Sequence, residues 1–402
     1  MGPLRVLLVS WEYPPVMYGG LGRHVHALSH ALSLQGHEVV VLTQGPPGTP
    51  AADPAVQGRP RVQRAVLGSG SPDVYADTAR FVDHLQGALV QAAEPLLAHW
   101  RPDVVHGHDW VVAEAAASLV AAGSGTMVVT VHATEAGLYQ GHLDTPFSRR
   151  RHAIEQSLVA QATRTIVCST AMHDEVVRAL AADPERTVVV PNGVDVQAWQ
   201  TSQQERDQAR RALGLTSHDP LLVLVGRLEW EKGAQDAIEA LGLLADEGVV
   251  AHLALIGNGA RRDDLARQAQ QRGVAAFVHP LGRMEDAQVT HVVAAADVAL
   301  VPSRYEPFGI VALEAMAAGT PVVVTSTGGL PDLVEDGISG LVVPPAAPEA
   351  LASAIGHLLA DASTRESLAA AARQRVITRF SWDRVAQATV EVYRDVYRDA
   401  DG

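Results

Sequence analysis

The chain has 402 residues, of which 47% are hydrophobic and 19% charged, with a formal net charge of −14 and a single cysteine, Cys168. This composition is typical of a globular protein with two or three domains, and the negative charge disfavours nucleic acid or an acidic membrane surface as the main partner. One cysteine excludes an internal disulfide. The apolar runs are too short for a signal-peptide core or a membrane span, so we expect a cytoplasmic protein, with peripheral membrane association left open.

Short apolar runs alternate with helical patterns along the whole chain, which predicts a doubly wound, parallel α/β architecture. Each of two series of strands begins with a strand, a loop and an amphipathic helix, so we expect two similar halves joined near Pro191–Trp199. Residues 44–60 are rich in Pro and Gly and are expected to form a mobile surface loop. The buried strands are expected within residues 4–10, 37–43, 103–108, 126–132, 164–169 and 186–193, and then 220–227, 251–259, 276–282, 297–303 and 320–326.

The stretch YGGLGRHVHALSHAL places three glycines before a helix whose first turn carries Arg23 and His24. Positive charge is unfavourable at a helix N-terminus, whereas bare N–H groups there bind anions such as phosphate. An external anion is therefore one interpretation of this loop, and a tight turn with glycine at positive φ is the other. Val25 replaces the third glycine of a G-x-G-x-x-G motif, which disfavours a dinucleotide oxidoreductase.

Polar residues follow the strands of the first half, at the edge where parallel sheets bind ligands. The motif HGHDW contains His106, His108 and Asp109, and His132 ends the strand MVVTVH. We weigh a metal site here but do not expect one, because strand residues alternate between faces and His106 and His108 need not converge. His132 is interpreted equally well as a functional residue or as a buried histidine bonded to backbone.

In the second half, GRLEWEKG places Arg227 just past a buried strand and Lys232 at the start of a helix. Two cations and a helix N-terminus suit a diphosphate, although a solvated loop paired with Glu229 and Glu231 is the alternative.

The motif EPFGIVALE has Glu306 in a loop and Glu314 two turns into the next helix, with the N–H groups of Phe308 and Gly309 between them. A carboxylate beside free donors suits sugar hydroxyls, which both donate and accept hydrogen bonds.

Together, WEYPPVMYGGLGRHVHAL, VVHGHDW, TVHATEAG, GRLEWEKG and SRYEPFGIVALEAMAAGTPVV…GG resemble the retaining, glycogen-synthase-like glycosyltransferases of GT-B fold, in order from Val6 to about Trp382. The resemblance is closest to actinobacterial enzymes that add glucose in α-1,4 linkage to glycogen-like glucans or methylated glucose polysaccharides. It implies two Rossmann-like domains facing across a cleft, with residues 1–192 on the acceptor side and 193–380 on the nucleotide-sugar donor side. Residues 381–402 would form a C-terminal helix that packs back on the first domain.

The resemblance also implies roles for individual residues. Arg227 and Lys232 would hold the donor diphosphate, Glu306 the transferred sugar, Glu314 the ribose, and Arg283 would lie near the base. The residues implied to bind the donor are Gly19, Gly20, Arg227, Lys232, Arg283, Glu306, Phe308, Gly309, Ile310 and Glu314. Those implied to act in catalysis, with His132 and Asp109 beside the sugar, are His132, Asp109, Arg227, Lys232 and Glu306.

Two features separate the chain from the starch-synthase type of glycogen synthase. Met17 stands where that type has a lysine, and Glu314 is present where that type usually lacks the second glutamate. The choice between ADP-glucose and UDP-glucose stays open, as does the oligomeric state. No cofactor or metal is expected, because Arg227 and Lys232 would supply the positive charge; the only Asp-x-Asp pair is Asp399 with Asp401.

The expected partners are a nucleotide-sugar donor and a glucan or oligosaccharide acceptor. Three alternatives share the motifs: a mannosyl- or other hexosyltransferase, a nucleotide-sugar epimerase, and a non-catalytic nucleotide-sugar binding module.

Overall fold

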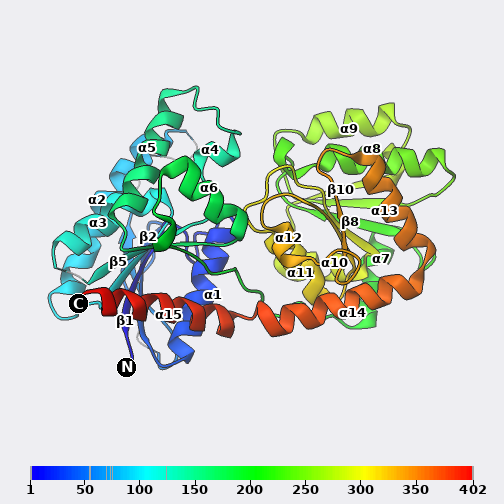
Figure 1. Ribbon diagram of the computed structural model, residues 1–402. Helices are drawn as coiled ribbons and strands as arrows, with labels where there is room; N and C mark the ends of the chain where they lie inside the picture. The colour runs from blue at the N-terminus through cyan, green and yellow to red at the C-terminus, as the bar shows by residue number, and fades with distance from the viewer. Residues whose placement is uncertain are drawn as a thin grey trace. The chain divides into compact units, whose positions relative to one another are not determined.

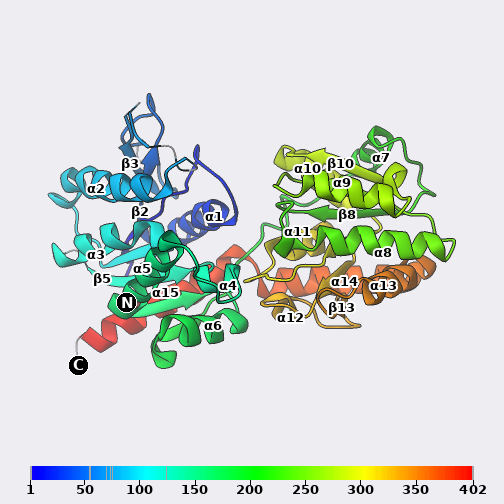
Figure 2. The same cartoon turned by 90° about the horizontal axis from the view of Figure 1, so that it is seen from above.

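The computed structural model describes residues 2–53, 56–68, 70–72, 74, 76–123 and 125–400, the last four as backbone only. The chain divides into two units, Met1–Asn192 with Trp382–Gly402, and Gly193–Ser381 (Figure 1). Each unit has a parallel sheet with helices on both faces (Figures 1 and 2), which confirms the predicted fold class. Across the described ranges, no helix combines the length and the apolar character that a membrane crossing requires.

The sheet of the first unit has seven strands in the order β3-β2-β1-β4-β5-β6-β7, and every neighbouring pair is parallel. Strand β1 lies in the interior of the sheet between β2 and β4, and Leu7 is in register with Val40 on one side and Val105 on the other. Both faces are buried, as an all-parallel sheet requires. The strands are β1 (Arg5–Val9), β2 (Glu38–Gly45), β3 (Arg61–Val66), β4 (Val104–His108), β5 (Thr126–Val131), β6 (Arg164–Val167) and β7 (Thr187–Val189).

Alternate residues of β1 supply the two hydrophobic cores of this unit. Leu7 and Val9 pack into the core that α2 and α3 cover, whereas Val6 and Leu8 pack into the core that α1 and α15 cover. The last helix therefore completes one face of the first unit. The helices of this unit are α1 (Gly20–Leu34), α2 (Thr78–Leu97), α3 (Ala113–Ala121), α4 (Glu135–Leu138), α5 (Pro146–Gln161), α6 (Thr170–Leu180) and α15 (Trp382–Ala400).

The sheet of the second unit has six parallel strands in the order β10-β9-β8-β11-β12-β13. Leu222 and Leu224 of its central strand pack against α8 and α13. The strands are β8 (Leu221–Val225), β9 (His252–Ile256), β10 (Val278–Gly282), β11 (Val298–Val301), β12 (Val322–Thr325) and β13 (Leu341–Val343). The helices are α7 (Gln203–Ala212), α8 (Ala234–Asp246), α9 (Arg262–Gln271), α10 (Asp286–Ala295), α11 (Ile310–Ala318), α12 (Leu330–Leu333), α13 (Pro348–Ala360) and α14 (Ala362–Arg379).

The sequence missed one edge strand in each sheet, β3 and β13. Strand β3 carries Arg61, Gln63 and Arg64, so it lacks the continuous apolar run of a central strand. Arg64 is nevertheless buried, because its guanidinium forms an ion pair with Asp53 at 2.6 Å. Asp53 lies in the segment that we expected to be a mobile loop, and part of that segment pairs with β3 through Ala52 and Gln63.

The order of the strands creates one switch point in each sheet. In the first sheet, β2 and β3 are added on one side of β1, and the chain then returns to place β4 to β7 on the other side. In the second sheet, β9 and β10 are added on one side of β8, and β11 to β13 on the other. Ligands of open α/β sheets bind beyond the carboxyl ends of the strands at such points. The topology therefore selects the loops after β1, β4, β8 and β11 as the places for a site.

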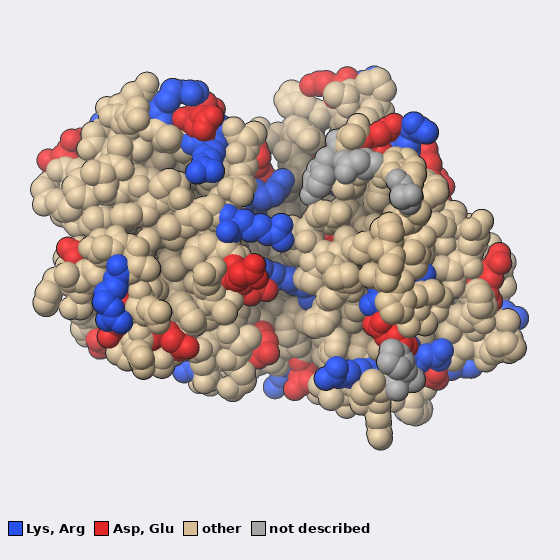
Figure 3. All heavy atoms as spheres, turned by 180° about the vertical axis from the view of Figure 1, so that it is seen from behind, with Lys and Arg blue, Asp and Glu red and all other residues tan. Residues whose placement is uncertain are grey.

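Charged side chains are distributed unevenly but with mixed sign on the surface. On the face in Figure 3, acidic and basic side chains lie next to one another at several places, and other residues make up most of the surface. Ion pairs between exposed Arg and Asp or Glu side chains occur in both units, such as Arg5 with Asp103 and Arg267 with Asp264.

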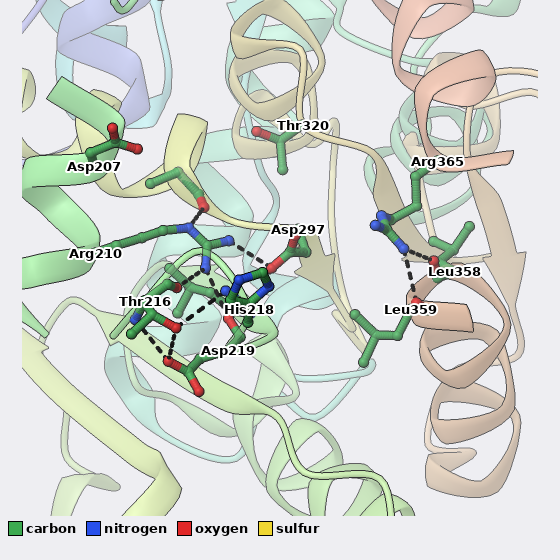
Figure 4. A network of polar contacts seen from close by, with 12 residues as sticks. Asp207, Arg210, Thr216, His218, Asp219, Asp297, Thr320, Leu358, Leu359 and Arg365 are labelled. Carbon is green, nitrogen blue, oxygen red and sulfur yellow. Dashed lines mark hydrogen bonds and ion pairs between the residues drawn. The ribbon is translucent and has the colours of Figure 1, made fainter. Parts of the chain in front are cut away.

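Arg210 of α7 fixes the start of the second sheet (Figure 4). Its guanidinium donates to the carbonyl oxygens of Thr216 and Asp219 at 3.1 and 2.8 Å, and to the Asp297 carboxylate at 2.7 Å. Asp297 also accepts the backbone N–H of Leu221, the first residue of β8, at 2.8 Å. One half-buried cation thus connects α7 to the beginnings of β8 and β11, whose far ends carry the switch-point loops.

We expect Arg210→Ala to destabilise the second unit by about 2 kcal/mol, because it removes several hydrogen bonds to a charged group and leaves Asp297 with fewer partners. Calorimetric unfolding, with hydrogen exchange of β8 and β11 peptides to assign the transition, measures the effect. Arg211→Ala, an exposed neighbour on the same helix, is the matched control. Equal unfolding temperatures for the two variants would contradict this role of Arg210.

Candidate functional site

The switch point of the second sheet brings together two residues that the sequence placed 74 positions apart. The ammonium nitrogen of Lys232 lies 2.8 Å from Oε2 of Glu306, and the hydroxyl of Ser303 donates to the same oxygen at 3.0 Å. Lys232 follows β8, and both Ser303 and Glu306 follow β11. The side chain of Lys232 is 23% exposed and that of Glu306 is 13% exposed, so the ion pair is partly shielded from water.

Glycines hold these loops in contact backbone to backbone. A Cβ at Gly233 would lie 1.9 Å from the carbonyl oxygen of Pro302, and a Cβ at Gly328 would lie 1.8 Å from that of Glu306. Both glycines also have positive φ, at 71° and 55°. The carbonyl of Glu306 accepts the N–H of Gly329 at 3.0 Å. These close approaches fix where Lys232 and Glu306 sit.

Arg227 lies in the same loop as Lys232 but is held more loosely. Its side chain is 64% exposed and its guanidinium contacts Glu231 at 2.7 Å. An exposed ion pair of this kind contributes little stability, so the guanidinium can exchange Glu231 for another anion at small cost. The structure thus gives the acidic pairing that the sequence offered as the alternative, with Glu231 as the partner.

Arg304 is a structural residue of this loop that the sequence did not single out. Its guanidinium binds both carboxylate oxygens of Asp236 at 2.7 and 2.9 Å and lies 4.8 Å from the ring centre of Trp230. Its backbone N–H donates to the carbonyl of Glu231 at 2.7 Å. Arg304 therefore ties the loop that carries Lys232 to the loop that carries Glu306.

The start of α11 offers unsatisfied donors beside Glu306. The helix has no side-chain cap and no acidic residue in its first turn, and its N-cap Gly309 has φ 110°. The free N–H groups of Ile310 and its neighbours favour a partner with lone pairs or negative charge.

Phe308 is buried against Phe380, and Glu314 is buried within the helix. Arg283 is exposed after β10, two strands away from β8 in the sheet.

Lys232 has a further property that could have been found in the sequence. It is the only lysine among the 31 basic residues of the chain. Arginine serves every other basic position, including the buried ion pairs. A lysine differs by its compact charge and its three rotatable donors, which can keep one oxygen partner while reaching a second. That the only lysine lies at the switch point indicates a functional role, and the prediction from motif spacing did not consider it.

The glycine loop after β1 already holds an anion from the chain itself. Oε2 of the buried Glu12 accepts the N–H groups of Tyr18 and Gly19, both at 2.9 Å. Burial raises the pKa of this carboxyl although the N–H groups of Tyr18, Gly19 and Gly22 oppose the rise. A Cβ at Gly22 would lie 3.1 Å from Glu12, which gives a steric reason for that glycine.

Of the two interpretations of the glycine loop, the structure contradicts the turn with positive φ, and the binding of an external anion stays a prediction. The expectation of positive φ is wrong, since Gly19 is extended, with φ −166°, and Gly20 and Gly22 lie within α1. The expected positive charge of His24 is also wrong, because complete burial lowers its pKa to about 3. An internal carboxylate binds part of the loop, and the first turn of α1 has no acidic residue and no side-chain cap.

Four histidines cluster beneath this loop. We expected that His106 and His108 need not converge, but their ring centres lie 4.3 Å apart, because residues two apart in a strand share a face. Both nitrogens of His106 are bonded, to Tyr393 of α15 and to Thr130, each at 2.7 Å. Nδ1 of His108 lies 3.2 Å from Nε2 of His132.

Asp109 and His132 meet as neighbours at the carboxyl ends of β4 and β5. The backbone N–H of His132 donates to Oδ1 of Asp109 at 2.7 Å. Asp109 has φ 63°, an unfavourable conformation for a residue with a side chain, and burial raises its pKa to about 6. Burial lowers the pKa of His132 to about 4, so its imidazole is neutral at pH 7.

Two further carboxylates lie next to Asp109 and were not singled out from the sequence. Glu135 and Glu155 are buried, and both contact the guanidinium of Arg151, at 2.8 and 3.1 Å. Burial raises the pKa of Glu155 to about 7 against the opposing charge of Arg151. Arg151 also lies 5.1 Å from the ring centre of Trp110. The arginine is thus charge-balanced by its own chain.

The predicted Asp-x-Asp pair lies outside the described residues, because Asp401 and the side chain of Asp399 are not described.

Comparison with known proteins identifies the family. The description "Glycosyl transferases group 1" matches residues 205–375, and "Glycosyltransferase Family 4" matches residues 18–198. A glycogen synthase of Mycobacterium tuberculosis is 39% identical over 403 residues, which cover 97% of this chain and 94% of that one. The chain belongs to glycosyltransferase family 4.

Other members of this retaining family are also similar over their full length. An α-maltose-1-phosphate synthase of M. tuberculosis is 31% identical over 98% of this chain and 100% of its own. Among solved structures, the sucrose-phosphate synthase of Thermosynechococcus elongatus has a TM-score of 0.80 and 25% identity, covering 98% and 99% of the two chains. The glycosyltransferase therefore has the GT-B fold, and its Lys232–Glu306 pair lies within the matched group 1 segment.

The buried imidazoles make the stability of the first unit dependent on pH. His24, His106, His108 and His132 have lowered pKa values in the folded state, so the unfolded chain binds more protons between about pH 4 and 6.5 and stability falls with acidity. Glu12, Asp109 and Glu155 have raised pKa values and act in the opposite direction. The pKa values of His26 and His37 are also lowered, so six histidines outweigh three carboxyls. We therefore expect unfolding of this unit at pH 7 to occur about 5 to 10 °C above that at pH 5.

Calorimetry in the presence of EDTA, with hydrogen exchange of β4 and β5 peptides to assign the transition, measures this difference. His24→Gln should reduce it, whereas His142→Gln, which removes an exposed imidazole of the same unit, should leave it unchanged. Greater stability at pH 5 than at pH 7 would show that the three carboxyl groups with raised pKa values dominate.

Proposed function

We propose that this glycosyltransferase transfers glucose, with retention, from ADP-glucose or UDP-glucose to the non-reducing end of an α-1,4-glucan or a related glucose oligosaccharide. The 39% identity to a glycogen synthase over 97% of the chain is the observation that carries the proposal. The switch-point geometry of the second sheet supports it, because a cation, a carboxylate and a helix N-terminus lie together there.

On the donor side, Arg227 and Lys232 hold the diphosphate, and Glu306 with the backbone of Phe308, Gly309 and Ile310 holds the glucose. The contact between Lys232 and Glu306 gives this assignment a physical basis. The ammonium group can keep Glu306 as one partner and donate to a phosphate oxygen with another N–H. Lys232 is then held in place before the reaction, as electrostatic stabilisation of a leaving group requires.

The remaining assignments follow the family resemblance. Glu314 binds the ribose, Arg283 lies near the base, and Gly19 and Gly20 approach the diphosphate. His132 and Asp109 flank the transferred sugar. The leaving diphosphate gains negative charge as the bond to glucose breaks and helps to take the proton of the attacking hydroxyl. Positive charge that is already in position stabilises this state without a metal ion.

The charges around Arg151 support an unphosphorylated acceptor. Its guanidinium is shared between Glu135 and Glu155, and Asp109 adds a third carboxylate nearby. A phosphate group brought to this edge of the first sheet would meet an arginine that is already neutralised, together with excess acidic groups. A neutral sugar meets acceptors and donors for its hydroxyls instead. This arrangement favours a glucan over a sugar phosphate.

A maltose-1-phosphate-forming activity is the second candidate, because an α-maltose-1-phosphate synthase is 31% identical over nearly the whole chain. It would require a phosphorylated acceptor, so the two candidates differ in the acceptor alone. A mannosyl- or other hexosyltransferase differs in the donor, and an epimerase would need no acceptor.

A panel of donors and acceptors in EDTA tests the proposal. We expect turnover with ADP-glucose or UDP-glucose and malto-oligosaccharides, and α-1,4-linked products one or more glucose units longer. Glucose 1-phosphate should be a poorer acceptor by at least tenfold. The assay measures nucleotide release, product length and linkage, with GDP-mannose as the control donor.

Each contrary result has its own meaning. Preference for glucose 1-phosphate would replace the glucan acceptor, and release of a free epimerised sugar without acceptor would replace transfer altogether. Loss of activity in EDTA that magnesium or manganese restores would contradict the metal-independent role of Arg227 and Lys232.

A second prediction separates binding from chemistry in the Lys232–Glu306 pair. Lys232→Ala should lower turnover about a hundredfold, a cost on the order of 3 kcal/mol, and weaken nucleotide binding less, because its attraction grows with the charge of the leaving group. Glu306→Ala should lower turnover while nucleotide affinity stays nearly unchanged. Calorimetric titration with the nucleotide and steady-state kinetics measure both effects, and Glu335→Ala, an exposed ion-pair residue of the same unit, is the control.

Because Lys232 is the only lysine, lysine-selective modification adds an independent measurement. Reductive methylation should label Lys232 and the α-amino group, and ADP or UDP should protect Lys232 alone. Nucleotide binding that leaves the labelling of Lys232 unchanged, or an intact affinity with normal turnover in Lys232→Ala, would exclude it from the diphosphate site.

A further inference from the structure

Three imidazoles of the first unit converge on one another from three different elements. His24 comes from α1, His108 ends β4 and His132 follows β5. The ring centre of His24 lies 4.8 Å from that of His132 and 5.4 Å from that of His108. The ring centres of His108 and His132 lie 5.5 Å apart. The three rings therefore surround a common point.

The ring nitrogens have spacings close to those of a metal site. One nitrogen from each of the three residues lies within 4.8 Å of one from each of the others. Nδ1 of His108 and Nε2 of His132 are 3.2 Å apart. Two nitrogen ligands of tetrahedral zinc lie about 3.4 Å apart, as follows from Zn–N distances of about 2.0–2.1 Å. The nitrogen spacings of the cluster, all 4.8 Å or less, therefore exceed the zinc value by at most about 1.4 Å, which side-chain movement can close.

The nitrogen of His24 that faces this cluster lacks a partner. Its Nδ1 lies 2.7 Å from the amide oxygen of Asn192, so Nδ1 carries the proton and Nε2 has a free lone pair. Within the described ranges, Nε2 of His24 and Nε2 of His108 are buried without any hydrogen bond. Asn192 acts here as the outer hydrogen-bond partner that metal-binding histidines commonly have.

The surroundings of the three imidazoles favour binding of a metal dication over protonation of the rings. Burial keeps the imidazoles neutral, which is the form that binds metal. The carboxylate of Asp109, bonded to the backbone of His132, adds negative charge close by. His106 does not join the set, because Tyr393 and Thr130 occupy both of its nitrogens.

We propose that His24, His108 and His132 bind one transition-metal dication of the zinc class, with a fourth position open to water or to a sugar hydroxyl. Three histidines and an open position are a known zinc arrangement. The ion is not required for transfer. Because it takes the ring nitrogen of His132 that would face the sugar, bound Zn²⁺ inhibits transfer; this second statement rests on the proposed function, whereas binding does not.

Titration of the purified, metal-free full chain with Co²⁺ tests the binding directly. We expect one Co²⁺ per chain with the intense visible absorption of a four- or five-coordinate ion, and displacement of that absorption by Zn²⁺. His24→Gln should weaken binding at least tenfold. His30→Gln is the matched control: it lies on the same helix and pairs with His26, with ring centres 4.4 Å apart, which is the other place on α1 where a metal could bind.

The outcomes distinguish this proposal from the proposed function. Unchanged Co²⁺ binding in His24→Gln, loss of binding in His30→Gln, or only the weak absorption of octahedral surface-bound Co²⁺ would overturn the site, whatever the transferase assay shows. If the site binds Co²⁺ as expected, Zn²⁺ should inhibit transfer in the native chain, EDTA should reverse the inhibition, and His24→Gln should raise the inhibitory Zn²⁺ concentration at least tenfold. Metal binding without inhibition would refute the second statement alone.

Discussion

The ion pair between Lys232 and Glu306 is the contact on which the candidate donor site depends. It forms because β8 and β11 are neighbours at the switch point of their sheet. The loops that follow these two strands therefore begin side by side at the carboxyl edge. Gly233 and Gly328 let the backbones of these loops approach closely. Arg304, in the loop after β11, binds Asp236 and so connects the two loops. A partly shielded pair in such a frame loses little freedom when a ligand binds, which is the condition for effective electrostatic stabilisation.

The first unit follows the opposite electrostatic principle. Its polar edge contains three imidazoles that burial keeps neutral, those of His24, His108 and His132, beside the carboxylate of Asp109, whose pKa burial raises to about 6. Arg151, the cation among them, is balanced by two glutamates. Such a surface has little net attraction for phosphate, which supports the proposal that the acceptor is a neutral sugar. In the proposed function, the second unit binds the charged donor.

The same neutral imidazoles underlie the proposed metal site. A neutral imidazole nitrogen can serve as a hydrogen-bond acceptor for a sugar or as a ligand for a transition-metal dication. Asn192 fixes the tautomer of His24 and so leaves its inner nitrogen without a proton. The proposed competition between sugar and metal depends on that one arrangement.

The sequence by itself determined the parallel α/β fold, the two strand series and the loops in which the polar residues lie, because continuous apolar runs and strand-end motifs are local features. It also contained the single lysine at position 232. Tertiary structure decided the rest. Strand β3 was missed because polar residues interrupt its sequence, and β13 was missed because its apolar run is only three residues long. Glu12 as the anion of the glycine loop, the convergence of His24 with His108 and His132, and the neutralisation of Arg151 all depend on burial and on contacts between distant segments. Burial sets whether a histidine is charged, and no spacing along the chain records it.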